Sequence, residues 1–286
     1  MSTVTPTKRK RKKSFEGNYI ILKIVVFLLL IYLLLPIIIV VISSFAQEEY
    51  LTLTPSAFSL RWYENFFSNT GLRNSFRNSL VLALASTFFA LVIGTLSAYA
   101  MDKSKWRRFF ISFFGSPLLI PAIIIGIAMM QMANLLGLPR SMPILIVAHT
   151  LVGIPYVVRT VTASLYRFNA FWEEASFTMG AGRFKTIWYV TLPILKPGLI
   201  ASGCFAFITS FGNMTISTFL TTSRFMTLPI QLFAYAKNYV DPTIAAVSAT
   251  TLLLTTVILL VVDRLVGIYF SIVFSSLSGL CVSPLF

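Results

Sequence analysis

The 286-residue sequence is poor in the side chains that carry most enzyme and metal chemistry. It has one histidine, His149, and two cysteines, Cys204 and Cys281, and none of these stands at metal-ligand spacing from another. HExxH, G-x-S-x-G and CxxC motifs are absent. We therefore predict no catalytic residues, no metal centre, no disulfide and no cofactor, and we do not expect an enzyme.

The sequence also lacks the G-x-x-x-x-G-K-[ST] loop that binds nucleotide phosphates, so any ATP-driven work would need a separate polypeptide. Charged residues are scarce as well, at 11% of the chain against 57% hydrophobic residues. A soluble domain of this composition would expose too much apolar surface to water. Most of the chain is therefore expected to lie in lipid.

Six stretches are apolar and long enough, at about 20 residues each, to cross a hydrocarbon layer of about 30 Å. The sequence thus predicts an all-α, polytopic membrane protein with a basic tail at 1–18, a six-span domain at 19–270 and an apolar C-terminal extension at 271–286, to which we assign no role. The expected spans are 19–45, 78–101, 109–136, 142–165, 197–221 and 244–270.

Basic residues are distributed unevenly around these spans. The formal net charge is +14, and six basic residues form the run 8–13. In a soluble protein this excess would favour nucleic acid as a partner, but beside an apolar segment it indicates a retained anchor on anionic lipid. With that tail in the cytoplasm, the loops 102–108 and 166–196 are cytoplasmic, as are both termini. The other side then receives only Arg61, Arg73, Arg77, Arg140, Arg224 and Lys237.

The loop 168–198 is too long for a simple turn and is patterned like two short helices. Asn169 is a good cap, and Glu173 and Glu174 fall in the first turn, where the helix dipole favours negative charge. Gly180 and Gly182 are expected to stop the first helix. A second helix is expected over 183–190, ended by the Leu192-Pro193 pair.

This loop resembles the EAA loop of binding-protein-dependent ABC importer permeases, in which E-A-A, G and I-x-L-P follow one another at fixed spacing. Ser176 replaces the second alanine of the family pattern, and Val190 replaces the isoleucine. The resemblance implies a type I ABC importer permease fold and a loop that docks on a cytoplasmic ATPase. The implied coupling residues are Glu173, Glu174, Ala175, Ser176, Gly180, Val190, Leu192 and Pro193.

The same resemblance implies a permease subunit of an importer in the bacterial inner membrane. Its expected partners are an ABC ATPase dimer, a second permease subunit, an extracytoplasmic substrate-binding protein over 46–77 and 222–243, and the lipid bilayer. No nucleic acid is expected among them. The second permease is either the same chain or a different one.

The segment 50–63, with Tyr50-Leu51-Thr52 and Phe58-Ser59-Leu60-Arg61-Trp62-Tyr63, is similar to the second permease of the spermidine/putrescine class. Importers of opines, phosphonates and other small solutes share this region, so those substrates stay open. An ion-coupled secondary transporter would need an acid inside the membrane, but Asp102 and Asp263 lie near membrane edges. A scaffold that binds an ATPase without forming a conduit is a further alternative.

Polar residues inside a bilayer are costly and often face a cavity. His149 has the alternative of a packing role with satisfied hydrogen bonds, and Asn213, in a polar break of the fifth span, has that of bonding between helices. The candidate lining residues of the solute path are Gln131, Asn134, His149, Asn213 and Thr215.

Overall fold

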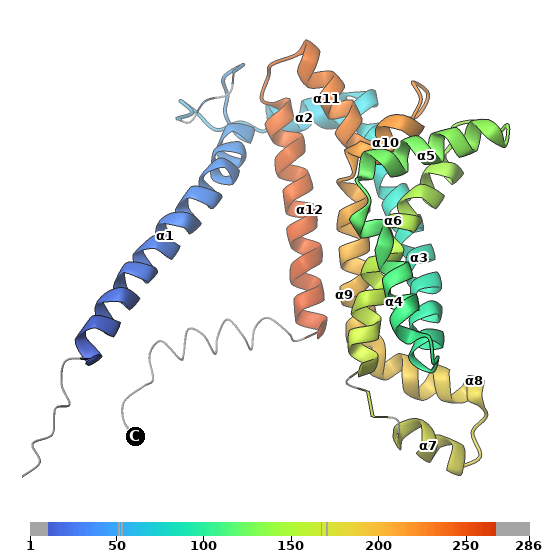
Figure 1. Cartoon of the computed structure of the whole chain (residues 1–286). Coiled ribbons are helices and arrows are strands. Elements are labelled where there is room, and N and C mark those ends of the chain that lie inside the picture. Colours follow the sequence, from blue (N-terminus) through green and yellow to red (C-terminus); the bar gives the residue numbers. More distant parts are fainter. Residues whose placement is uncertain (1–10, 51, 53, 167, 170, 267–286) are drawn as a thin grey trace, which may run out of the picture. The chain divides into compact units, whose positions relative to one another are not determined.

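The computed structural model describes residues 11–266 except 51, 53, 167 and 170, and of residues 11–20, 265 and 266 it describes the backbone alone. All regular elements of this part of the chain are helical, as the composition predicts (Figure 1). The basic run 8–13 and the extension 271–286 fall on residues that are undescribed or described by backbone alone. The helices are α1 (Arg11–Ser44), α2 (Arg61–Ser68), α3 (Thr70–Asp102), α4 (Arg107–Gly115), α5 (Ala122–Leu135), α6 (Met142–Tyr166), α7 (Phe171–Thr178), α8 (Arg183–Thr186), α9 (Leu192–Phe211), α10 (Met214–Leu220), α11 (Leu228–Asn238) and α12 (Thr243–Val266).

Five helical segments in this described part are long and apolar enough to cross a membrane, and one bent pair supplies the sixth span. The span expected over 109–136 corresponds to this bent pair. α4 continues into a 3₁₀ turn at Ser116–Leu119, and α5 leaves it at 95°. Pro117 lies in the 3₁₀ turn and Pro121 stands at the start of α5, and each proline lacks the N–H that would continue the hydrogen bonding of the preceding helix.

The fifth span also departs from expectation at its beginning. The Leu192-Pro193 pair does not end the helix, because α8 passes through a π-helical turn at Ile187–Thr191 directly into α9. The Leu192 N–H donates to the Ile187 carbonyl, five residues back. This wider turn accommodates Pro193, which has no N–H to donate. At the other end, the predicted polar break is confirmed, since α9 ends at Phe211 and α10 begins at Met214.

The described chain forms two compact units. One comprises residues up to 66 together with 240–249. In it the Trp62 indole donates to the Ala46 carbonyl at 2.7 Å, and the Asn65 amide donates to the Thr243 hydroxyl at 2.8 Å. These bonds hold the short helix α2.

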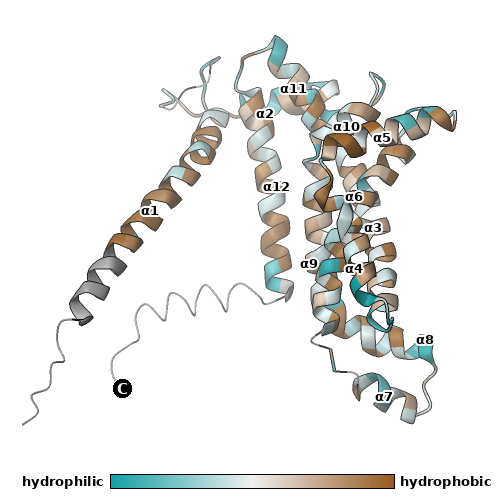
Figure 2. Cartoon of the chain, in the orientation of Figure 1, coloured by the Kyte–Doolittle hydropathy of each residue, from teal (hydrophilic) through white to brown (hydrophobic). Residues whose placement is uncertain are grey.

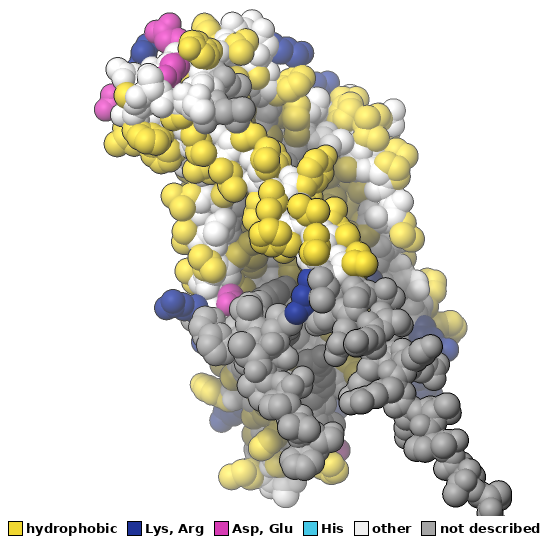
Figure 3. Space-filling view, turned by 90° about the vertical axis from the view of Figure 1, so that its left-hand side faces the viewer, with side chains coloured by type: hydrophobic (Ala, Val, Ile, Leu, Met, Phe, Trp, Pro, Cys, Tyr) yellow, Lys and Arg dark blue, Asp and Glu magenta, His cyan; other side chains and the backbone are white. Residues whose placement is uncertain are grey.

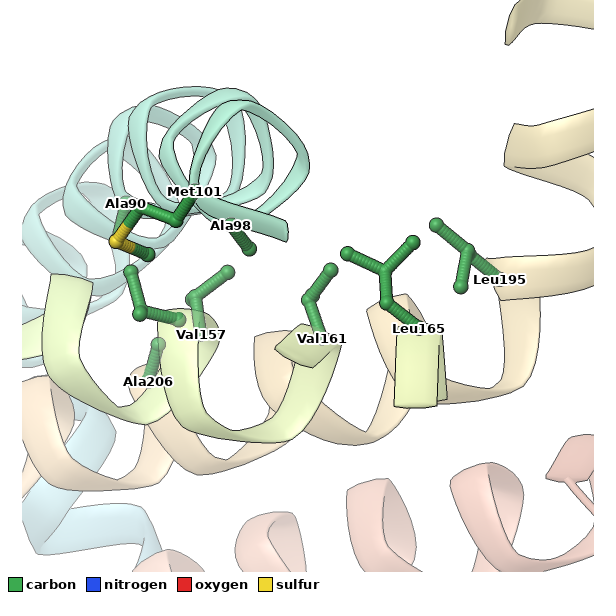
Figure 4. Close-up of a cluster of buried hydrophobic side chains, with 9 residues drawn as sticks. Ala90, Ala98, Met101, Val157, Val161, Leu165, Leu195 and Ala206 are labelled. Atoms are coloured by element: carbon green, nitrogen blue, oxygen red, sulfur yellow. The ribbon is translucent and has the colours of Figure 1, made fainter. Parts of the chain in front are cut away.

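The other unit comprises residues 67–239 with 250 onward, and α3, α6 and α9 pack along one another in it. Small residues allow close approach of these helices. A Cβ added at Gly94 would lie 2.7 Å from the Val157 Cβ, so glycine is required where α3 meets α6. Figure 4 shows the resulting core, in which side chains of the three helices point toward one another: Ala90, Ala98, Met101, Val157, Val161, Leu165, Leu195 and Ala206.

Large apolar side chains also cover the outside of the long helices. In Figure 2 apolar colouring is continuous on α1 and alternates with pale residues on the other long helices, while hydrophilic colouring is seen near α7 and α8. The face in Figure 3 carries a broad area of hydrophobic side chains. Exposed residues such as Phe88, Ile123 and Leu253 would be unfavourable in water. They suit a lipid environment.

Candidate functional site

The helix α7 begins and ends where the sequence predicts. The Asn169 side-chain oxygen accepts the Phe171 N–H at 3.0 Å, which satisfies one free donor at the helix start. At its end, Gly180 has φ +84°, and its N–H donates to the Phe177 carbonyl at 2.9 Å. The Ala181 N–H donates to the Ser176 carbonyl at 3.1 Å. This bond pair is the Schellman motif, and it reverses the chain toward α8.

Glu173 is turned inward, with 7% of its surface exposed. Its Oε2 accepts a bond from the Lys103 Nζ at 2.7 Å, just past the end of α3. Its Oε1 accepts the Tyr99 hydroxyl of α3 at 3.1 Å and the Thr191 hydroxyl at 2.8 Å. One carboxylate therefore joins α7 to α3 and to the base of α9.

The electrostatics of this cluster favour the ion pair. Burial by itself raises the pKa of Glu173, but hydrogen bonds from Lys103, Thr191 and Tyr99 outweigh it and hold that pKa below its usual value. Burial likewise lowers the pKa of Lys103, and the bonds to Glu173 and Tyr99 more than compensate and raise it. Both groups are thus charged at neutral pH, and the Lys103 ammonium also lies 4.5 Å from the centre of the Tyr99 ring.

The remaining motif residues of α7 differ in how far they are exposed, and the second half of the motif lies in another element. Glu174 and Ala175 are exposed on α7. Ser176 is half-buried, and its hydroxyl lies 3.0 Å from that of Thr186, which ties α7 to α8. The second half of the motif does not join this helix. It lies in the π turn and at the start of α9, with two residues half-buried and one exposed: Val190, Leu192 and Pro193.

Large apolar side chains surround the exposed part of the loop, and the sequence pattern places Phe184 and Trp188 on one face of its second helix. Met179 is 89% exposed and Phe171 is 72% exposed. On the next turn, Phe184 and Trp188 stack with ring centres 6.3 Å apart. The sequence feature that points to this exposed apolar surface is the run of large apolar residues in α7, a helix of eight residues that is too short to span a membrane. Figure 1 places α7 and α8 beyond one end of the α3, α6 and α9 bundle.

The candidate path residues are not gathered in one place. His149 is buried, and its ring nitrogens lie 2.8 Å from the Ser210 hydroxyl and 3.1 Å from that of Ser217. It therefore connects α6 to both sides of the break between α9 and α10. Asn213 caps α10 by accepting the Ile216 N–H at 3.0 Å. The other three candidates have exposed side chains: Gln131 and Asn134 on α5 and Thr215 on α10.

No group of three His, Cys, Asp or Glu side chains within the described residues is placed to hold a metal ion. Cys204 is buried in α9 as a free thiol. Two polar clusters connect helices of the membrane bundle: the Glu173 cluster joins α7 to α3 and the base of α9, and the one around His149 joins α6 to α9 and α10. Of the two, only the first adjoins an exposed element.

Comparison with known proteins gives a consistent result. Residues 90–270 match the family described as binding-protein-dependent transport system inner membrane component. The spermidine/putrescine transport system permease protein PotC of Escherichia coli K12 is 28% identical over 212 residues, which cover 73% of this chain and 80% of PotC. The putrescine transport system permease protein PotI of the same organism is 28% identical over 218 residues, covering 73% and 77%.

Solved structures share the fold. A bacterial ABC transporter involved in the import of the acidic polysaccharide alginate has a chain that superposes with a TM-score of 0.67 at 18% identity. The match covers 91% of this chain and 99% of that one. At this identity the likeness concerns the fold alone.

Proposed function

Since this chain belongs to the family of binding-protein-dependent inner membrane transport components and is a permease subunit of an ABC importer, we propose that it forms half of the path for a polyamine such as spermidine or putrescine. Two relatives named for these solutes align with about three quarters of the chain and support this substrate class. An external binding protein would deliver the solute, and a second permease subunit would complete the path.

The described spans hold acidic side chains only at their ends, Asp102 and Asp263. A polycation held within this subunit would therefore meet backbone carbonyls, hydroxyls and amides in place of carboxylates. We infer that the binding protein or the second permease supplies most of the selectivity. Uptake assays with opines and phosphonates alongside polyamines distinguish this substrate class from its alternatives.

The observation that carries the proposal is the shape of α7. It is a short helix, fixed at both ends by caps, with Glu174, Ala175 and several large apolar side chains exposed. Small residues permit close approach of another surface, and an exposed carboxylate can pair with a basic group on that surface. We infer that α7 inserts into a cytoplasmic ABC ATPase, whose closure on ATP turns the spans outward. Its reopening then releases solute inward.

We place the α7 end of the bundle, and both chain termini, on the cytoplasmic side. Basic residues near this end support that orientation: Lys103, Lys105, Arg107, Arg108, Arg183, Lys185 and Lys196. The segments around α2 and α11 would then face the binding protein.

Glu174→Arg tests the docking proposal, because it reverses an exposed charge on α7 without touching the buried cluster. The intact protein is purified from its native membrane and the associated chains are identified. We expect an ATPase and a second permease with the natural protein, and loss of the ATPase from the variant. The matched control is Glu64→Arg, an exposed charge reversal on α2, which should keep the ATPase. Equal recovery of ATPase with both variants would contradict the docking site.

A further inference from the structure

Glu173 stands beside the glutamate of the family motif but plays a different part in the structure. Glu174 is exposed, whereas Glu173 is buried and binds three side chains of the membrane bundle. We propose that Glu173 is a positioning residue that makes α7 move as one body with α3 and the base of α9. This inference rests on the proposed function of α7, because it concerns how motion of that helix reaches the spans.

The anchoring of α7 is unusual in its chemistry. Of the eight residues of α7, all of which the structure describes, Glu173 alone is buried. The large apolar side chains that would hold an ordinary surface helix by hydrophobic burial are turned outward here, Phe171, Trp172 and Phe177 among them. The attachment of α7 to α3 is therefore made by one carboxylate.

The geometry of this attachment suits transmission of a force. The carboxylate accepts bonds at 2.7 Å, 2.8 Å and 3.1 Å from three side chains, so its orientation is fixed in more than one direction. The Lys103 Nζ also donates to the Tyr99 hydroxyl at 2.8 Å, which fixes the lysine in turn. Bonds to charged groups are shorter and stronger than neutral ones, particularly where one partner is buried.

The contacts of Glu173 connect elements that are distant in sequence. Lys103 follows α3, the first helix of the three-helix bundle, and Thr191 ends the π turn that leads into α9. A displacement of α7 would reach both helices at once through a single side chain. Ser176 makes a separate bond to Thr186, but this bond joins α7 only to the neighbouring α8. Loss of the carboxylate would thus leave α7 attached to α8 and released from α3.

The test uses the complete importer in proteoliposomes with Glu173→Gln, which keeps the size of the side chain and removes its charge. We expect the ATPase to remain bound and to hydrolyse ATP, while solute moved per ATP hydrolysed falls by about tenfold, within the usual range for coupling between two sites. Amide hydrogen exchange in α7 should rise in the same variant. Lys103→Met, which alters the exposed partner of the pair, should reproduce both effects.

Two further variants separate this role from general destabilisation. The double variant Glu173→Lys with Lys103→Glu restores opposite charges, and the Tyr99 and Thr191 hydroxyls can accept bonds as well as donate them. It should recover part of the lost transport per ATP, which a merely damaged fold would not do. Glu64→Gln, which changes an exposed glutamate in the first turn of the short helix α2, is the matched control, and it should leave α7 exchange unchanged.

These experiments separate failure of the Glu173 anchor from failure of the proposed function. If the natural protein carries no ATPase, the proposed function is wrong, and the exchange measurement still tests the anchor itself. Natural values of both transport per ATP and α7 exchange in Glu173→Gln would overturn the inference. So would equal loss in the single variants and in the charge-exchanged double variant.

Discussion

At the scale of single residues, two opposing effects set the charge state of the Glu173 and Lys103 pair. Burial disfavours both charges, and mutual hydrogen bonds restore them. Removing one member of a buried pair is costly because the other charge is left without its partner. Lys103 is 54% exposed in its side chain, so water screens its half of the pair and moderates that cost.

The pair predicts a defined pH dependence. The lowered pKa of Glu173 contributes stability that is present above its usual value of 4.5 and is lost as pH falls through the lowered value. The raised pKa of Lys103 contributes stability that is present below 10.5 and is lost as pH rises through the raised value. We expect amide protection of α7, corrected for intrinsic exchange, to stay constant from about pH 6 to about pH 9. A transition near neutral pH would contradict the assigned ion pair.

The inward orientation of Glu173 was not predictable from the sequence. Glu173 and Glu174 are the same residue type, lie in the same helical turn and interact equally well with the helix dipole. What separates them is a lysine 70 residues away and a threonine 18 residues away. Local pattern carries no information about such contacts. The local features of the same segment, the Asn169 cap and the Gly180 stop, were predicted correctly because they depend on nearby backbone alone.

At the scale of elements, the end of α7 depends on one backbone conformation. Gly180 has φ +84° with no heavy atom within 4 Å of an added Cβ, so Gly180→Ala costs only the left-handed strain, about 1–2 kcal/mol. Gly182 has an ordinary φ of −72° and equally open surroundings. We expect Gly180→Ala to speed exchange of the Gly180-position and Ala181 amides and to weaken ATPase recovery, whereas Gly182→Ala does neither. Equal effects of the two substitutions would argue against the turn as the cause.

The number of spanning segments was predictable from the sequence, but the bend within one of them was not. An apolar run of sufficient length indicates passage through lipid, and five segments and one bent pair fulfil it. The 95° bend before α5 was not predictable, because the residues on both sides of it are apolar. Prolines mark where a helix can break, and they do not specify the angle or the new partner. Here α5 packs against α10, beyond the break of another span.

At the scale of the whole molecule, the larger unit, residues 67–239 with 250 onward, combines a packed core with broken helices at one end and a short exposed helix at the other. α3, α6 and α9 form the core, and His149 connects α6 to both sides of the break between α9 and α10. This arrangement suits a subunit that transmits motion along its length. The sequence contains no nucleotide-binding loop, and in the proposed function the energy comes from a separate ABC ATPase.

The most direct test is uptake of radiolabelled spermidine and putrescine into proteoliposomes that contain the chain with its co-purified subunits, ATP on the ATPase side and the binding protein on the other. We predict uptake that requires both ATP and the binding protein and that stops when either is omitted. Uptake by the chain alone, driven by an ion gradient without ATP, would contradict the importer account and indicate a secondary transporter.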